Sequence, residues 1–404
     1  MLVAVSLIIP IDNDYRYIDY KAHLSATHYD GFSELNDVLR KSEFPQNDYD
    51  AVNYDNPVGV WISYIELDEM LRNSTEDSFR SSINEAFSNI KSLGANTVYV
   101  HVRAFGDAYY PSLYYPWTSA FGESEPFDAL EIMIEEAHGL ELSFHAWINP
   151  LRCSNIENTD GQELNYKLFE LYDNIGEKIV KPGDNPYMWL NPAYGDVRNL
   201  VSAGCAEIAS RYDVDGIHID DYFYPTTDES FDAEAFKQSG QDSLSDWRMN
   251  NISKLVMMMN IEIKKANPSV VFEISPQGNV NNNYVQMFAD VGKWCESKLY
   301  CDIIIPQVYF GYNSSSPYLT TIEKWSNMVS ENGPQLVIGL GVYKIAEETE
   351  FGNTENIIAS QINDAYKLQN VCAVAFYNYR TLFDEGELMD RMQSERKAIS
   401  EILK

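Results

Sequence analysis

The sequence is poor in cysteine. Its 404 residues include only five, and no two of them form a CxxC pair. This argues against a metal knuckle or a dithiol redox motif and gives no support for a disulfide framework. We expect buried free thiols, and one bridge between Cys295 and Cys301 stays open as an alternative. The five are Cys153, Cys205, Cys295, Cys301 and Cys372.

Basic side chains are also scarce, with 29 lysines and arginines against 61 aspartates and glutamates, for a formal net charge of −32. A surface of this charge repels polyanions, which argues against a nucleic-acid partner and against adsorption to anionic lipid. Neutral ligands such as uncharged sugars are compatible with it. A charge that serves solubility alone explains the composition equally well.

No apolar run approaches the roughly 18 residues of a membrane span, so we expect no membrane-spanning segment. The first ten residues, MLVAVSLIIP, are apolar but lack a basic start and a clear cleavage site. They fit either the remnant of an export signal or a buried strand.

Several catalytic motifs are missing as well. The sequence has no GxSxG elbow, no HExxH pair and no Walker loop. Acyl transfer by a serine triad, zinc hydrolysis and phosphotransfer are therefore poorly supported, and we expect no cofactor and no metal.

What is present is enough apolar material for a large core, at 45% hydrophobic and 13% aromatic residues. Residues 1–56 are polar, acidic and rich in tyrosine, and they end in the turn-like NDYDAVNYDNP. We interpret them as an N-terminal extension or linker, and residues 57–404 as one catalytic domain.

After Pro57, short apolar runs alternate with amphipathic stretches, which is typical of βα units. Helical patterns cover residues 75–93, 127–138, 197–212 and 247–266, among others. Eight strand candidates, each followed by a helix candidate, predict an α/β fold of the (β/α)8 TIM-barrel type with enlarged βα loops. A doubly wound sheet would use fewer strands and a Gly-rich fingerprint, which is absent. The strand candidates are Gly59–Tyr64, Asn96–Arg103, Leu142–Pro150, Val214–Asp221, Val270–Pro276, Cys301–Phe310, Gln335–Tyr343 and Val371–Tyr379.

Polar and aromatic residues collect at the ends of these runs, where a barrel places its active site. Because side chains alternate along a strand, residues two apart share a face. Rings stack on the apolar faces of sugars, while amides, carboxylates and guanidinium groups bind hydroxyls, so the pattern favours a carbohydrate site. The candidates for substrate binding are Trp61, His101, Arg103, Asp107, His145, Trp147, Asn149, Arg152, His218, Tyr222, Gln307 and Tyr309, with Ser275, Tyr377 and Tyr379 on the same strand ends.

Two adjacent carboxylates follow the fourth run, in the stretch GIHIDDYFYP. Glycosidic cleavage uses one carboxyl group to protonate the leaving oxygen and another to attack carbon or activate water. Asp220, in register with His218, is predicted to point into the barrel mouth as nucleophile or base. Asp221 and Glu273 are the candidates for the second group. A buried salt bridge between Asp220 and an arginine is the structural alternative.

The motifs HVRAFGDAYYPS, YYPWTSAFG, FHAWINPLR, WLNPAYGDVRN, GIHIDDYFYP, FEISPQGN and IIPQVYFGY occur in an order that resembles the bacterial glycosyl-hydrolase-like family 10. The resemblance covers residues 57 to 380 and implies a TIM-barrel glycoside hydrolase. It further implies an extracellular or cell-envelope location and a glycan substrate, which in the family includes cell-wall glycan strands lacking peptides.

Carried over motif by motif, the resemblance places Asp220 and Asp221 on the family's paired aspartates. It places Arg103 and Asp107 in its arginine-to-aspartate loop. His145, Trp147, Asn149 and Arg152 fall in its HAW-N-P-R segment, and Gln307 and Tyr309 in its PQ-Y segment.

The sequence departs from the family pattern at Glu273, where a small residue is more usual. This shifts weight from Glu273 to Asp221 as the second acid. A barrel that binds sugars without cleaving them is the alternative function, and a lyase or transglycosylase is a third hypothesis.

Overall fold

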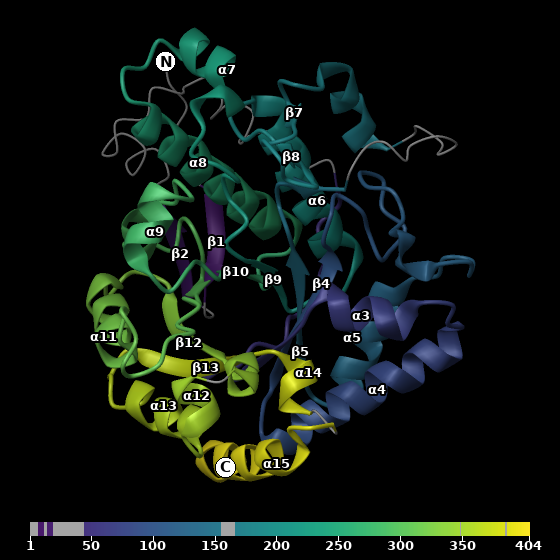
Figure 1. Cartoon of the computed structure of the whole chain (residues 1–404). Coiled ribbons are helices and arrows are strands. Elements are labelled where there is room, and N and C mark those ends of the chain that lie inside the picture. The colour runs from purple at the N-terminus through teal and green to yellow at the C-terminus, as the bar shows by residue number, and fades with distance from the viewer. Residues whose placement is uncertain (1–6, 12–13, 19–43, 155–165, 348, 384–385) are drawn as a thin grey trace.

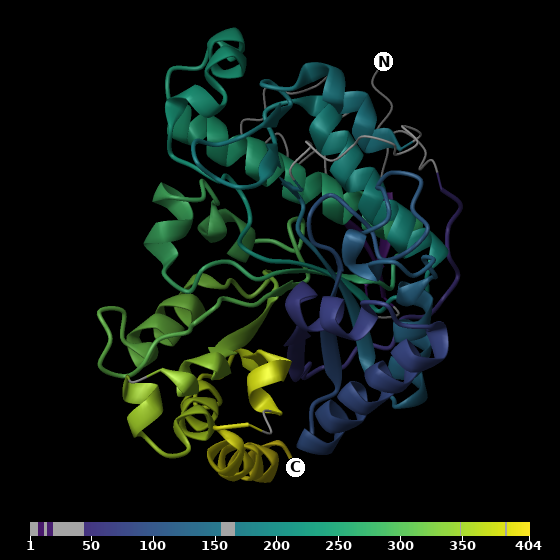
Figure 2. The same ribbon diagram turned by 45° about the vertical axis from the view of Figure 1, so that its right-hand side comes forward.

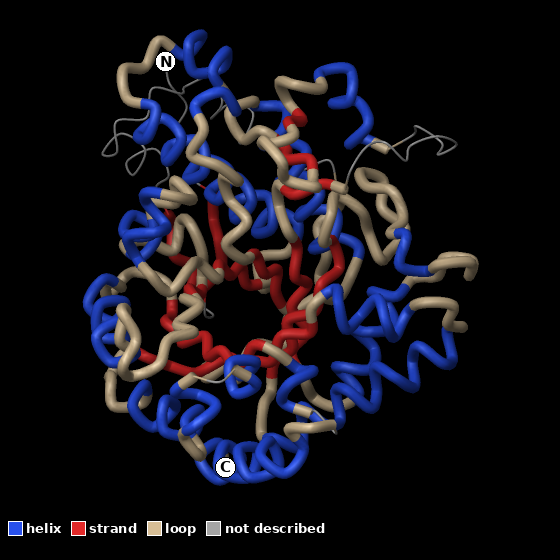
Figure 3. Tube along the Cα trace, viewed as in Figure 1, coloured by secondary structure: helices blue, strands red, loops and turns tan. Residues whose placement is uncertain are grey.

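The computed structural model describes residues 7–11, 14–18, 44–154, 166–347, 349–383 and 386–404. Eight parallel strands close into a barrel, visible as the central ring of strands in Figure 3. Every strand predicted from the sequence is present, so the predicted TIM barrel is confirmed. In order around the barrel the strands are β3 (Gly59–Ile62), β4 (Thr97–Arg103), β5 (Ser143–Ile148), β9 (Gly216–Ile219), β10 (Val271–Ile274), β11 (Ile303–Ile304), β12 (Gln335–Gly341) and β13 (Val371–Tyr377), which pairs with β3.

Helices surround the ring of strands (Figure 1). The four helical patterns singled out in the sequence correspond to α4 (Glu76–Leu93), α5 (Ala129–Gly139), α6 (Gly195–Arg211) and α8 (Leu244–Ala266). Thr75 caps the start of α4, and Gly94, with φ of 103°, ends it in the left-handed conformation that glycine tolerates. The remaining helices are α3 (Tyr64–Leu71), α7 (Ala233–Ser239), α9 (Val280–Val285), α10 (Val291–Cys295), α11 (Tyr318–Met328), α12 (Glu350–Asn353), α13 (Ile357–Ala365), α14 (Tyr379–Leu382) and α15 (Met389–Leu403).

The long connections after β5 and β9 carry structure that the sequence did not predict. A small antiparallel sheet of β6 (Arg152–Cys153), β8 (Met188–Leu190) and β7 (Ile179–Val180) lies in the first, together with the 3₁₀ helix Lys167–Asn174. The second connection leads through α7 to α8, which packs against α6 (Figures 1 and 2). These insertions enlarge the βα side of the barrel.

Two glycines let large side chains fill the barrel interior. A Cβ atom on Gly59 would lie 2.1 Å from the Tyr99 ring, and one on Gly216 would lie 2.6 Å from Nδ1 of His145. Close approach of this kind is possible only where no side chain stands. The interior is therefore a packed core below the strand ends.

Residues 44–58 run along the side of the barrel where the strands begin. The amide of Asn47 donates to the carbonyl of Tyr212, and the Asn267 amide donates to the carbonyl of Tyr49. Asp215, directly before β9, accepts hydrogen bonds from the Tyr49 hydroxyl at 2.8 Å and from the Val52 backbone. Residues 44–58 thus lie opposite the carboxyl ends of the strands and do not cover them.

Two further expectations concern the first residues and the cysteines. Residues 7–11 form β1 (Leu7–Ile11), which pairs with β2 (Asp14–Ile18), while residues 1–6 lie outside the described residues.

All five cysteines are free, and four of them are buried, so the alternative bridge between Cys295 and Cys301 is not formed. In the parts of the chain that the structure describes, no helix is long and apolar enough to cross a bilayer.

Candidate active site

A cleft of about 230 Å³ opens at the carboxyl ends of the barrel strands. Nine of the fifteen residues predicted for the site line it, namely Trp61, His101, Trp147, Arg152, Asp220, Asp221, Tyr222, Gln307 and Tyr309. Ser275 and Tyr377, noted at strand ends, also line it. Asp220 is therefore at an open cavity, as the sequence predicted.

Asp220 and Asp221 follow β9 directly and have different surroundings. Oδ1 of Asp220 is buried and has no hydrogen-bond partner among the described residues. Asp221 accepts a hydrogen bond at 3.2 Å from the Gln307 amide, which also donates to the Ser275 carbonyl at 3.0 Å. One carboxyl is thus left for a ligand, and the other is held in place by the protein.

Burial and mutual repulsion govern the protonation of this pair. Burial raises the pKa of Asp220 well above its usual value, the charge of Asp221 raises it further, and the Arg152 guanidinium opposes both. Burial also raises the pKa of Asp221, but hydrogen bonds from Gln277 and Gln307 lower it in part. Burial therefore favours the protonated form of Asp220 more strongly than that of Asp221, whose hydrogen bonds favour its ionised form.

Arg152 forms one wall of the cleft and is only 4% exposed. Its guanidinium lies 4.1 Å from the centre of the Tyr222 ring and 4.3 Å from that of Phe105, and its Nε donates to the Ala104 carbonyl. Nη2 is buried without a partner among the described residues. The rings fix the cation, and one of its donors stays available to a ligand.

Aromatic rings form much of the rest of the cleft. The rings of Tyr309 and Tyr377 stack at 5.8 Å, and Tyr343 meets both edge-on at 5.9 Å and 5.7 Å. On the other side Trp147 stacks on His101 at 3.4 Å. Rings in this number around buried carboxyls suit a ligand with apolar faces and polar edges, as sugars have.

His101 is held neutral beside these groups. Burial lowers the pKa of His101 well below its usual value, and the Arg152 charge lowers it further. Its Nδ1 accepts a hydrogen bond from the Tyr64 backbone at 3.0 Å. His101 therefore presents a neutral ring to the cleft and does not add charge to it.

The structure places Glu273 below the cleft, with no exposed surface. Its Oε2 lies 2.7 Å from Nδ1 of His145 and 3.4 Å from Nδ1 of His218, and the Trp61 indole donates to Nε2 of His218 at 3.1 Å. Burial alone would raise the pKa of Glu273, but the charges and hydrogen bonds of the two histidines lower it below its usual value. Glu273 was predicted as a candidate acid, and His145 and His218 as substrate-binding residues, but all three lie beneath the cleft, where they support its floor and do not line it.

Arg103 lies outside the barrel, although the alternation rule predicted that it shares a face with His101. The register between β4 and β5 shifts between these two residues, and the irregularity turns the strand end. The guanidinium packs 4.1 Å over the Tyr115 ring and against Gly204 of α6, where a Cβ would meet it at 2.5 Å. Arg103 fastens the β4 loop to α6.

Asp107 and Asn149 also stay away from the cleft. Asp107 accepts a hydrogen bond from the Phe105 backbone at 2.9 Å, and the Asn149 amide donates to the Ala104 carbonyl at 3.0 Å. Both shape the loop that carries Phe105 against Arg152. Their contribution to a site is therefore indirect.

Sequence reasoning missed Ser63, Tyr64 and Tyr343, which line the cleft. Ser63 and Tyr64 come directly after β3, and Tyr343 is the last residue of the predicted seventh run. Their position at the ends of predicted strands could have identified Ser63, Tyr64 and Tyr343 as site residues, but the prediction did not include them. Among the described residues, no group of three or more His, Cys, Asp or Glu side chains is placed to hold a metal ion.

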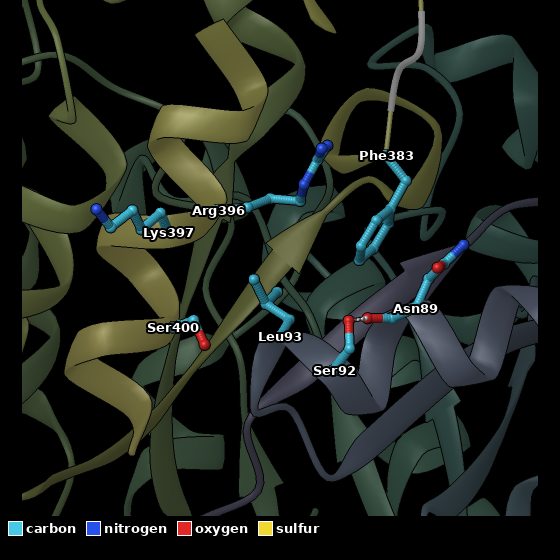
Figure 4. A pocket seen from close by; sticks show the side chains of 7 residues that line it. All are labelled: Asn89, Ser92, Leu93, Phe383, Arg396, Lys397 and Ser400. Atoms are coloured by element: carbon cyan, nitrogen blue, oxygen red, sulfur yellow. Dashed lines mark hydrogen bonds between the residues drawn. The ribbon is translucent and has the colours of Figure 1, made fainter. Parts of the chain in front are cut away.

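A second hollow, of about 270 Å³, lies between α4 and α15, outside the ring of strands (Figure 4). The Ser92 hydroxyl there donates to the carbonyl of Asn89 at 2.7 Å. It offers no carboxyl group for acid–base chemistry, so the smaller cleft at the strand ends is the candidate active site. The residues that line the hollow are Asn89, Ser92, Leu93, Phe383, Arg396, Lys397 and Ser400.

A (β/α)8 barrel with paired carboxyls in a ring-lined cleft at its strand ends defines a protein of the glycoside-hydrolase type. Comparison with known sequences agrees. The family described as glycosyl hydrolase-like 10 matches residues 58–355, and the chain belongs to this family.

Two curated relatives have names of the same kind. The chain is 35% identical over 288 residues to the glycosyl hydrolase YngK of Bacillus subtilis, an alignment that covers 64% of this chain and 54% of the relative. It is 32% identical over 290 residues to the glycosyl hydrolase DigH of Escherichia coli K12, covering 65% of each. The chain thus matches less than two thirds of the length of these relatives.

Solved structures show the same fold at low identity. The glycoside hydrolase domain of PgaB (BpsB) from Bordetella bronchiseptica superimposes with a TM-score of 0.58 at 11% identity, covering 85% of this chain and 98% of that one. The catalytic domain of β-amylase from Paenibacillus polymyxa gives a TM-score of 0.54 at 12% identity, covering 86% of this chain and all of the other. These likenesses concern the fold alone.

Proposed function

We propose that the chain is a glycoside hydrolase that cleaves O-glycosidic bonds of a bacterial glycan. The observation that carries the proposal is the pair Asp220 and Asp221 in a cleft where three other buried polar atoms have no partner among the described residues. Nη2 of Arg152, Nε1 of Trp147 and Oγ of Ser275 are all buried at the cleft without a hydrogen bond to the described residues. Unpaired buried polar groups are costly, and a polyhydroxylated ligand would satisfy them.

In this proposal Asp220 acts as general acid. It is the carboxyl that burial keeps protonated, so it can donate its proton to the leaving oxygen. Asp221 acts as its ionised partner, fixed by Gln307. The sequence-based hypothesis gave Asp220 the role of nucleophile or base. The assignment changes because Oδ1 of Asp220 is buried without a partner among the described residues, whereas Asp221 accepts a hydrogen bond from Gln307.

The substrate class that the family resemblance implies is the peptide-free glycan strand of peptidoglycan, and it is the first to test. The location proposed with it is extracellular or in the cell envelope. The test incubates the purified chain with such strands, with intact peptidoglycan and with common polysaccharides, and separates the products by mass. Hydrolysis adds one water per bond cleaved, whereas a lyase or an intramolecular transglycosylase gives unsaturated or anhydro ends.

A sugar-binding protein without catalysis is the alternative that the same cleft would allow, because rings and hydrogen-bond donors also serve binding alone. It predicts saturable binding of strands with no new reducing ends after long incubation. That result would contradict the proposed hydrolase.

A further inference from the structure

We infer, resting on the proposed function, that the attacking group is supplied by the substrate. The cleft would take a glycan whose reacting sugar carries a 2-acetamido group, and the carbonyl oxygen of that group would attack the anomeric carbon. Asp221 would accept a hydrogen bond from the amide N–H, and Asp220 would protonate the leaving oxygen.

The first step of the argument is the position of the two carboxyls. Direct hydrolysis by a carboxylate pair places the groups on opposite sides of the scissile bond, about 5–5.5 Å apart for retention and about 6.5–9.5 Å for inversion. Asp220 and Asp221 are consecutive residues after a single strand, β9, so both reach the sugar from the same wall. One wall can supply an acid but not an attack from the opposite face.

The second step is the composition of the facing walls. Among the described residues that line the cleft, no carboxylate other than these two is present. Two further buried acids, Glu273 and Glu66, are already engaged. Glu273 binds two histidines, and Glu66 accepts from the Ser63 backbone at 3.0 Å and the Asn378 amide at 2.7 Å. The described residues therefore offer no carboxylate nucleophile across from β9.

The third step is that the facing wall suits an acetamido group. Tyr309, Tyr343 and Tyr377, from the ends of β11, β12 and β13, form a box of mutually packed rings. The apolar faces of such a box accommodate a methyl group, and the rings restrict how the amide can turn. Asp221, held by Gln307, is the ionised acceptor that the amide N–H needs.

The proposed reaction requires no reactant other than the glycan and water. A lone pair of the amide oxygen forms a bond to the anomeric carbon while the glycosidic bond breaks, and its electron pair goes to the leaving oxygen, which takes the proton of Asp220. The resulting oxazolinium keeps its N–H on the Asp221 carboxylate. Water then attacks the same carbon, its proton goes to Asp220, and the ring opens to restore the acetamide with retained configuration.

The test compares one glycan with its own N-acyl variants. Peptide-free peptidoglycan strands are de-N-acetylated, and portions are then re-N-acetylated or N-trifluoroacetylated, which keeps size and charge but weakens the amide oxygen as a nucleophile. We expect cleavage of native and re-acetylated strands and a loss on the order of 10³-fold on trifluoroacetylated ones, because a positioned internal nucleophile contributes a very large effective concentration. Equal rates on acetylated and trifluoroacetylated strands would overturn the inference and leave the hydrolase standing, whereas no cleavage of any strand would refute the proposed function itself.

Binding provides a readout besides activity. The probe is N-acetylglucosamine-thiazoline, in which sulfur replaces the attacking oxygen of the cyclic intermediate. Calorimetry should show that it binds the wild type. It should bind Asp221→Asn at least about tenfold more weakly, because a charge-assisted hydrogen bond is lost. Absence of binding to the wild type would count against the inference.

A control addresses acidic residues outside the described part of the chain. A variant with Glu157→Gln, Asp160→Asn and Glu163→Gln should cleave native strands within about threefold of the wild type, because the substrate supplies the attacking group and these three carboxyls are not needed for it. Loss of cleavage in this variant, with its circular dichroism unchanged, would indicate a protein nucleophile and overturn the inference.

Discussion

At the scale of single residues, the pair Asp220 and Asp221 shows that a functional site can lower the free energy of unfolding. Two adjacent carboxyls in a buried cleft repel each other, and folding gains nothing from them. Only 5% of Asp220 is exposed, and one of its oxygens has no partner among the described residues. Such an arrangement is typical of functional sites, where local cost is offset elsewhere in the fold.

Asp220→Asn should therefore raise the free energy of unfolding at pH 7, by about 1 kcal/mol. The folded-state pKa of Asp220 lies above its unfolded value, so its contribution to stability is present at low pH and is lost as pH rises through the folded pKa. The gain of the variant over the wild type should thus shrink as pH falls toward about 4, the ordinary pKa of the carboxyl. Urea unfolding at pH 4 and pH 7 measures this, and a variant less stable than the wild type at pH 7 would contradict it.

Glu273 should behave in the opposite way. Glu273→Gln breaks a buried pair with His145 and should lower the free energy of unfolding by about 3–5 kcal/mol at pH 7. Because the pKa of Glu273 is lowered in the folded state, its stabilisation is present above the unfolded pKa and is lost as pH falls through the folded pKa. The difference from the wild type in urea unfolding should therefore narrow in acid; a constant difference across pH would show that packing alone is responsible.

The residue-level predictions from sequence succeeded where alternation decides the outcome and failed where it does not. Alternation placed Asp220 at the mouth, and this placement holds. It could not give depth, so it did not separate Asp220, at the cleft, from Glu273 beneath it. It also failed for Arg103, because no residue in HVRAF marks where β4 loses register with β5.

At the scale of elements, glycine decides how the strands of the barrel can pack. Gly216 opens β9 directly beside His145 of β5. The short apolar runs were enough to predict all eight strands, because fully buried parallel strands are continuous apolar segments. The sheet of β6, β8 and β7 escaped prediction because its strands have only two or three residues, too few to show a period.

Gly216→Ala should destabilise the protein by about 1–3 kcal/mol, because the new Cβ would lie 2.6 Å from the His145 ring in a packed interior. Gly139→Ala is the matched control, since it ends α5 with no atom within 4 Å of a new Cβ. It should leave stability unchanged or raise it slightly. Thermal unfolding of both variants tests the account, and equal melting temperatures would contradict it.

At the scale of the whole molecule, stability and chemistry occupy opposite ends of the barrel. Residues 44–58 bind where the strands begin, with Asp215 as a common acceptor for Tyr49, Val52 and the Phe144 backbone. The cleft lies where the strands end. This separation is general in (β/α)8 barrels and lets loops vary without loss of the core.

Tyr49→Phe should therefore lower the free energy of unfolding by about 1.5–3 kcal/mol, because it removes a hydrogen bond to a buried carboxylate. The kcat and KM of the folded variant should stay those of the wild type. Chemical unfolding and steady-state kinetics on peptide-free strands check both parts. A change in KM would mean that the extension communicates with the cleft.

The most direct test of the account is the release of reducing ends from peptide-free peptidoglycan strands by the wild type and by Asp220→Asn, with folding of both confirmed by circular dichroism. The account predicts hydrolysis by the wild type and a rate about 10²–10⁴-fold lower for the variant, the usual value of a general acid. An Asp220→Asn protein that cleaves the strands as fast as the wild type would contradict it.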